Sequence, residues 1–174
     1  MLLLSATIMA KKLCHAVQGI HIDIKGRQYP IQHRYEKETG EPTSKNIEQR
    51  VEHAIMSHTG TKDVLVFLPG KAEIKSTYQH IKRTFHPKWE ILMLHGGQSL
   101  QEQQRVFSPS QKRRVVLSTN VSETALTIPN IDIVIDSGLE RRTCYHHGRS
   151  FLGLFPIAQD SAIQRMGRAG RLGP

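Results

Sequence analysis

The residues with the clearest chemical potential are the arginines of the segment QRMGRAGR, at positions 164–171. Arg168 and Arg171 lie three positions apart, so on a helix both guanidinium groups would point to the same side. Two guanidinium groups that share a cleft can hold a phosphate. Gly167 and Gly170 would make such a helix thin, which lets a phosphate or another backbone approach closely. The alternative interpretation is a solvated basic helix.

The composition favours an anionic partner. Lys and Arg number 24 against 15 Asp and Glu, which gives a net charge of +9. That balance fits nucleic acid or nucleotide, although a generally basic surface would give it as well.

Cys14 and Cys144 lie far apart, and the histidines show no metal-ligand spacing, so neither a disulfide framework nor a metal site is expected. This cysteine usage fits a reducing cytoplasm. No apolar stretch approaches the roughly 20 residues that span a membrane, so the sequence predicts a soluble protein.

Helical and strand-like segments alternate along the chain and must position these side chains. Buried strands are predicted at 64–68, 90–94, 115–117 and 131–135, and helices at 9–17, 46–57, 72–85 and 100–107. Ser44 is expected to cap the second of these helices. Shorter strands are expected at 21–23 and 31–35, and a hairpin with arms 139–145 and 151–157. The alternation predicts an α/β fold with a mainly parallel sheet, whose chemistry lies at the carboxyl ends of the strands.

Two turns that follow predicted strands are suited to nucleic-acid phosphates. Ser118, Thr119 and Asn120 bring hydroxyl and amide groups, together with free backbone N–H groups at the start of a helix. Gly70 begins another such turn, where the lack of a side chain lets a sugar-phosphate backbone come close. Plain capping of the following helices is the alternative in both cases.

The segment at 164–171 resembles motif VI, QRxGRAGR, of the DEAH-box branch of superfamily-two helicases, and further segments match that family in its order. They are SAT at 5–7, VFLPG with EI at 66–74, LHG at 94–96 leading to QRVF at 104–107, and STNVSETALTI at 118–128. The resemblance covers essentially the whole chain. FLPG, LERR and AGRLGP are most similar to the bacterial HrpB type. The resemblance implies a RecA-like three-layer lobe with an inserted β-hairpin.

The family's catalytic roles carry over to the end of the chain. The resemblance implies that Arg171 is the arginine finger that reaches the γ-phosphate of ATP, with Arg168 beside it. Gln164 would orient the attacking water or contact the γ-phosphate, and Arg165 would be structural. An arginine finger contributes a factor on the order of 10³–10⁵ in rate in GTPases.

The resemblance also implies nucleotide contacts and coupling residues. Phe107 matches the aromatic residue that stacks on adenine, although an ordinary core phenylalanine is the alternative. Thr127 matches a residue that contacts the ribose, but Pro129 stands where the family usually has an acidic residue. Ser5 and Thr7, in the SAT motif, would couple hydrolysis to movement of the strand.

Nucleic-acid contacts are implied in two regions. Thr119 matches the family's best nucleic-acid contact. The hairpin carries Arg141, Arg142 and Arg149 and matches the wedge that the family inserts at a duplex junction, with a merely basic exposed hairpin as the alternative.

The resemblance divides the chain into the end of a first RecA-like lobe with its linker, 1–25, and a second RecA-like lobe, 26–174, truncated just after motif VI. Neither a GxxxxGK[ST] loop nor a DEAH-type magnesium motif occurs in the sequence. ATP and Mg²⁺ would therefore be bound mainly by the first lobe of the parent chain, and this chain alone would be inactive. The expected function is that of an ATP-dependent RNA helicase lobe, with a non-catalytic nucleic-acid-binding module or a DNA translocase lobe as alternatives.

Overall fold

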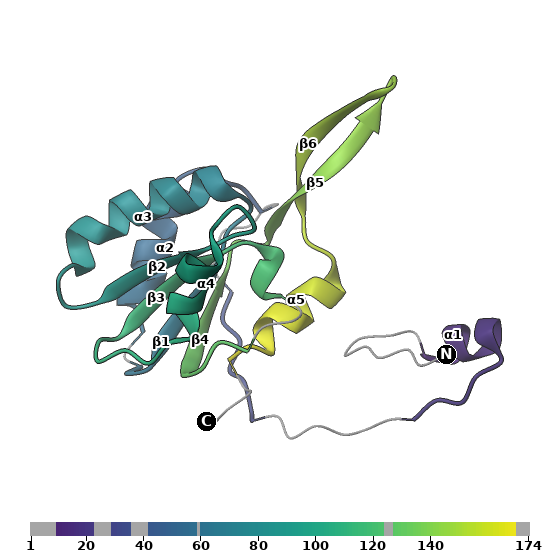
Figure 1. Ribbon diagram of the computed structural model, residues 1–174, viewed down its shortest axis with the longest axis horizontal. Coiled ribbons are helices and arrows are strands. Elements are labelled where there is room, and N and C mark those ends of the chain that lie inside the picture. Colours follow the sequence, from purple (N-terminus) through teal and green to yellow (C-terminus); the bar gives the residue numbers. More distant parts are fainter. Residues whose placement is uncertain (1–9, 23–28, 36–41, 59, 124–126, 170–174) are drawn as a thin grey trace.

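A parallel four-stranded sheet forms the centre of the molecule (Figure 1). The computed structural model describes residues 10–22, 29–35, 42–58, 60–123 and 127–169. The strands lie in the order β2-β3-β1-β4, with bounds β1 Asp63–Phe67, β2 Glu90–Leu94, β3 Arg114–Ser118 and β4 Ile131–Asp136. Every residue of the two inner strands, β1 and β3, is buried, as their uninterrupted apolar runs require. The predicted parallel α/β fold is confirmed.

Helices cover both faces of this sheet and give three layers. Helices α2, Ile47–Met56, and α3, Lys71–Phe85, pack on the face to which β1 directs Val64 and Val66. On the other face, β1 directs Leu65 and Phe67 toward α4, Leu100–Phe107. Helix α5, Gln159–Met166, lies on this second face, because the Arg165 guanidinium stacks 4.9 Å above the Phe67 ring.

A buried ion pair ties the amino ends of the inner strands together. Nη2 of Arg114 lies 2.6 Å from Oδ2 of Asp63, and both side chains are 3% exposed. The backbone N–H of Arg114 also donates to Oδ1 of Asp63, at 2.8 Å. Since a buried charge is stable only when it is paired and hydrogen-bonded, these residues fix the register of β1 and β3.

The predicted hairpin is present and extends away from the body of the molecule (Figure 1). Its strands, β5 Leu139–His146 and β6 Arg149–Pro156, pair antiparallel along their whole length. Only His147 and Gly148 form the turn, with φ values of 47° and 74°. Positive φ at both central residues is typical of the type I′ turn, whose twist matches that of paired strands.

Three local predictions near the amino terminus are wrong. Residues 21–22 and 29–35 form no strand in the described part of the chain, and most of their side chains are exposed, so no buried face selects a strand. Asp23 lies outside the described residues. Helix α1, Ala10–Val17, matches its prediction. Ser44 does not cap α2: Asn46 occupies the cap position at φ 52°, a conformation that asparagine tolerates well, and no side-chain hydrogen bond caps the helix.

Among the described residues, no helix is long and apolar enough to cross a membrane. No group of histidine, cysteine or acidic side chains in the same part of the chain is arranged to hold a metal ion.

Candidate functional site

The carboxyl ends of the strands bring the predicted nucleic-acid residues to one edge of the sheet. Gly70 follows β1 and Thr119 follows β3, which pair as neighbours. The loops are tied to one another at this edge: Leu68 N–H donates to the Ser118 carbonyl at 2.8 Å, and Thr119 N–H to the Leu94 carbonyl at 3.2 Å. The sheet therefore places both predicted turns side by side, as expected for parallel strands.

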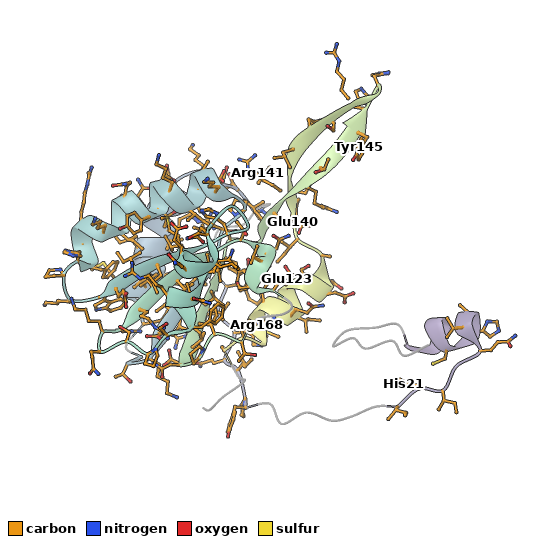
Figure 2. All side chains as sticks on the ribbon, in the orientation of Figure 1. His21, Glu123, Glu140, Arg141, Tyr145 and Arg168 are labelled. Atoms are coloured by element: carbon orange, nitrogen blue, oxygen red, sulfur yellow. The ribbon has the colours of Figure 1, made fainter. Side chains whose placement is uncertain are left out.

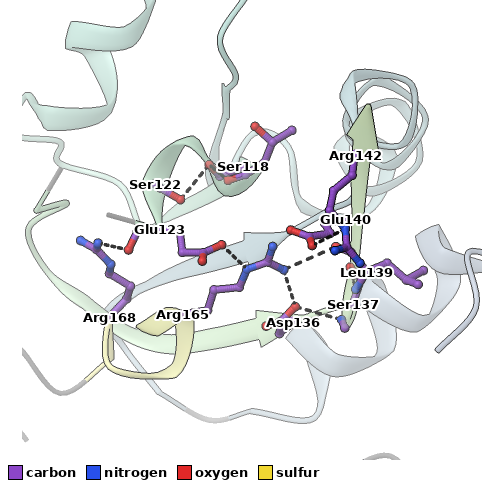
Figure 3. A network of polar contacts seen from close by, with 12 residues as sticks. Ser118, Ser122, Glu123, Asp136, Ser137, Leu139, Glu140, Arg142, Arg165 and Arg168 are labelled. Carbon is purple, nitrogen blue, oxygen red and sulfur yellow. Dashed lines mark hydrogen bonds and ion pairs between the residues drawn. The ribbon is translucent and has the colours of Figure 1, made fainter. Parts of the chain in front are cut away.

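The turn after β3 is built around a buried serine. The Ser118 hydroxyl donates to the Leu94 carbonyl at 3.2 Å. It also accepts from the Ser122 hydroxyl at 2.8 Å (Figure 3). The chain continues as a single 3₁₀ turn, η1, Asn120–Ser122. Asn120 is exposed and Thr119 is half-buried. The expectation of free N–H groups is wrong at Thr119, because its N–H is already bonded across to β2.

The motif VI segment is helical only at its beginning. Helix α5 ends at Met166, and Gly167 takes the C-cap position. The N–H groups of Arg168 and Ala169 then bond to the carbonyls of Arg165 and Met166, both at 3.1 Å, which is the tightened turn common at helix ends. Arg168 therefore lies beyond the helix, and the prediction that it shares a helical face with Arg171 is wrong for Arg168. Arg171 and Gly170 lie outside the described residues, as do Ser5 and Thr7.

Arg165 is buried and holds two carboxylates. Only 1% of its side chain is exposed, its Nε donates to Glu123 at 3.0 Å, and its Nη1 donates to Asp136 at 3.1 Å (Figure 3). The Leu139 carbonyl, where the hairpin begins, lies 3.5 Å from the same Nη1. Arg165 thus joins α5 to the turn after β3, to the end of β4 and to the hairpin. This geometry agrees with the structural role that the resemblance implied.

Arg168 also contacts Glu123, but through the backbone. It is 5% exposed, and its Nη2 donates to the Glu123 carbonyl (Figure 3). One residue of the turn after β3 is therefore held at its side chain by Arg165 and at its carbonyl by Arg168. No role for Glu123 was predicted from sequence, although it lies within the segment STNVSETALTI that contributes to the resemblance.

Two titratable groups at this edge have shifted pKa values. Burial raises the pKa of Asp136 above its ordinary value, and the Arg165 charge acts in the opposite direction. Burial lowers the pKa of His95, in the turn after β2, and the positive charge of Lys71 lowers it further. This lowered pKa favours the neutral form of His95, whose Nδ1 accepts a hydrogen bond from the Gly97 N–H at 3.2 Å.

The predicted nucleotide-contacting residues lie in a different region. Phe107 is the last residue of α4, is half-buried and packs against the core on that face of the sheet. This position is compatible both with stacking on adenine and with an ordinary core phenylalanine. Thr127 is exposed. Arg114, at the start of β3, donates to the carbonyls of Ser108 and Pro129 at 2.8 and 3.3 Å. The segments that contain Phe107 and Thr127 are therefore joined at the amino edge of the sheet.

Gln164 lies on α5 and is half-buried.

The hairpin arginines have separate positions. Arg141 lies where the hairpin leaves the body, whereas Tyr145 lies far out along it (Figure 2). Arg141 pairs with Glu73 at 2.6 Å, and Arg142 pairs with Glu140 at 3.0 Å. Arg149 is exposed beside the tip turn. The structure therefore does not gather the three arginines at one point of the hairpin.

Comparison with known proteins agrees with this architecture. Residues 45–173 match the family model described as the helicase conserved C-terminal domain. The chain is 36% identical to an ATP-dependent RNA helicase HrpA homolog of Haemophilus influenzae, over 99% of the chain and 14% of that protein. It is 37% identical to ATP-dependent RNA helicase HrpA of Escherichia coli, over 97% of the chain and 14% of that protein.

Solved structures are similar over almost the whole chain. A structure of the E. coli DExH-box NTPase HrpB superposes with a TM-score of 0.82 at 31% identity, over 98% of this chain and 22% of that one. The chain thus spans only 14% of the length of the HrpA relatives and 22% of the HrpB chain. The predicted resemblance to DEAH-box helicases and the predicted RecA-like lobe are confirmed. The chain belongs to the helicase conserved C-terminal domain family and has the fold of that lobe in DEAH-box helicases.

Proposed function

We propose that this chain is the second RecA-like lobe of an ATP-dependent RNA helicase. It forms part of the nucleic-acid groove and supplies the arginine finger, Arg171, to an ATP that is held mainly by another lobe. The proposed division of the chain is 1–25 for the end of the first lobe and its linker, and 26–174 for the second lobe. The names of the HrpA relatives support ATP-dependent action on RNA.

The observation that carries this proposal is that two arginines, Arg165 and Arg168, both form hydrogen bonds with Glu123. Arg165 and Arg168 belong to the segment that leads to the proposed finger, and both contact Glu123 in the segment that begins with Thr119. A change of phosphate occupancy at Arg171 would therefore act on the nucleic-acid turn through a short, buried set of contacts. Such a connection suits a motor that couples hydrolysis to strand movement, and a lobe that only binds nucleic acid does not need it.

The groove itself would use the carboxyl edge of the sheet. The exposed Asn120 and the half-buried Thr119 side chain offer polar groups to a phosphate, and Gly70 offers a backbone without a side chain. Arg149, at the hairpin tip, would contact nucleic acid farther out. These contacts read the backbone rather than the bases, so binding should depend on salt and little on sequence.

On the nucleotide side, Phe107 would stack on adenine, Thr127 would contact the ribose, and Gln164 would contact the γ-phosphate or its attacking water. The sequence contains no GxxxxGK[ST] loop, so the ATP phosphates and Mg²⁺ would be held by the first lobe. Ser5 and Thr7 would couple ATP hydrolysis to movement of the nucleic-acid strand. A phosphate finger acts by placing positive charge where the transferred phosphoryl group develops negative charge.

The test is Arg171→Ala in the full-length polypeptide to which this chain belongs. We expect ATP hydrolysis to fall by at least about 10³-fold, as for other arginine fingers, while binding of a fluorescent ATP analogue is retained. An unchanged turnover number would remove the finger assignment. Stimulation of the unaltered enzyme by RNA but not by DNA would distinguish the helicase from a DNA translocase.

A further inference from the structure

An ion pair joins the base of the hairpin to the first turn of α3. Nη2 of Arg141 lies 2.6 Å from Oε1 of Glu73, although the two residues are 68 positions apart in the sequence. The Arg141 side chain is 36% exposed and that of Glu73 is 14% exposed. Arg141 is therefore accessible from solvent, whereas its partner is recessed against the helix.

This ion pair covers the backbone of Gly70. A Cβ added at Gly70 would lie 2.9 Å from Cδ and Nε of Arg141 and 3.0 Å from Oε2 of Glu73. Gly70 is buried for this reason, even though it lies in the turn at the carboxyl end of β1. A phosphate that approaches the Gly70 backbone must first displace the Arg141 side chain.

The pair is also incompletely formed. Oε2 of Glu73 is buried and accepts no hydrogen bond in the part of the chain that the structure describes. The contact joins one nitrogen to one oxygen, whereas an arginine can bind a carboxylate or a phosphate through two parallel hydrogen bonds. A partly exposed ion pair of this kind contributes little to folding stability, so exchanging its partner costs little.

We propose that Arg141 leaves Glu73 for a backbone phosphate when a single strand enters the groove, and that this exchange uncovers Gly70. The Glu73 carboxylate offers Arg141 the same interaction that a phosphate would offer, because both groups carry negative charge on oxygen atoms. The exchange rests on the proposed function, because it requires nucleic acid at the carboxyl edge of the sheet. It assigns to Arg141 a phosphate contact at the hairpin base, distinct from any action of the hairpin tip.

The exchange predicts opposite effects for its two partners. The assay is fluorescence anisotropy of a labelled oligouridine with the full-length polypeptide, without nucleotide, at several salt concentrations. Arg141→Gln should weaken binding about threefold to tenfold and reduce the slope of log affinity against log salt by about 0.7, the value for one phosphate of a single strand. Glu73→Gln should strengthen binding, because the competing carboxylate is gone, and the double variant should bind like Arg141→Gln.

Arg105 and Glu90 provide a matched control. They form a more exposed ion pair, at 3.2 Å, between α4 and the start of β2, at the opposite edge of the sheet. Arg105→Gln and Glu90→Gln should each leave oligouridine affinity within about twofold, since neither faces the proposed groove. Thermal melting of every variant would verify that it is folded.

The exchange is overturned if Arg141→Gln and Glu73→Gln change RNA affinity in the same direction. That result is expected if the ion pair only stabilises the structure. An effect of Arg105→Gln equal to that of Arg141→Gln would overturn it as well, because it would reduce Arg141 to general positive charge. Those outcomes leave the proposed function standing. If the unaltered protein does not bind RNA at all, the proposed function fails, and the exchange fails with it.

Discussion

Replacement of Arg165 by methionine tests whether its ion pairs hold the site together. Methionine retains much of the volume of the side chain but removes the guanidinium that lies 3.0 Å from Glu123 and 3.1 Å from Asp136. Both carboxylates would then remain in a partly buried site without their cation. Burial of the two carboxylates would still cost free energy in the folded state, but the attraction to Arg165 would no longer offset that cost, so the folded state would be destabilised.

The expected loss follows from the burial of the three side chains. Arg165 is 1% exposed, Glu123 is 12% exposed and Asp136 is 24% exposed. Breaking a fully buried pair costs about 3–5 kcal/mol, and water that reaches Asp136 places this site at the lower end, about 3 kcal/mol. A chain of this size loses roughly 2–4 °C of melting temperature per kcal/mol, so the midpoint should fall by about 6–12 °C.

Urea denaturation followed by circular dichroism measures this loss, and a double-mutant cycle isolates its cause. Asp136→Asn should restore part of the stability of Arg165→Met, with a coupling of about 1–3 kcal/mol. The loss should also shrink as the pH falls toward 5, since burial already raises the pKa of Asp136 and removal of the cation raises it further. A proton then neutralises the carboxylate in the folded state.

The matched control is Arg105→Met, whose ion pair with Glu90 lies at the surface and whose side chain is 70% exposed. This variant should change stability by less than about 0.5 kcal/mol. A loss below about 1 kcal/mol for Arg165→Met, or no relief from Asp136→Asn, would refute the conclusion that Arg165 joins these segments through charge.

Three further predictions concern stability. Ser99→Ala removes the hydroxyl that accepts from the third residue of α4 in a complete capping box, and should cost about 1 kcal/mol in urea denaturation; no change would mean that the cap is dispensable. Asp63→Asn should cost about 3–5 kcal/mol, because Arg114 would keep a buried charge without its counter-ion; a melting temperature like that of the wild type would contradict this. Because burial and Lys71 lower the pKa of His95, the unfolded chain takes up the proton first, so stability should decline as the pH falls below about 6.5. His95→Gln should show a shallower decline in thermal melts at pH 5–7, and an identical pH profile would exclude His95 as its source.

The elements with the strongest local signal could be predicted from the sequence. The apolar run at 64–68 specifies a strand buried on both faces, and the structure has β1 at Asp63–Phe67. Predicted strand 90–94 and predicted helix 100–107 coincide with β2 and α4. The strands predicted at 21–23 and 31–35 are not formed where the structure describes these residues, and most of the side chains described there are exposed. Local pattern decides an element only when tertiary burial agrees with it.

The sequence by itself determined the family and the parallel α/β class, because the motifs and the apolar runs can be recognised from residues that are close together in the chain. It also indicated candidate site residues, but gave no role to Glu123. Only the tertiary structure decided that Arg165 and Arg168 both hold Glu123, 42 and 45 positions away. The same is true of Arg141, which covers Gly70 and pairs with Glu73. A chain with 24 Lys and Arg and 15 Asp and Glu offers many possible ion pairs. The crossover connections and the hairpin base select among them by bringing distant segments to one edge of the sheet, where burial makes an unpaired charge costly.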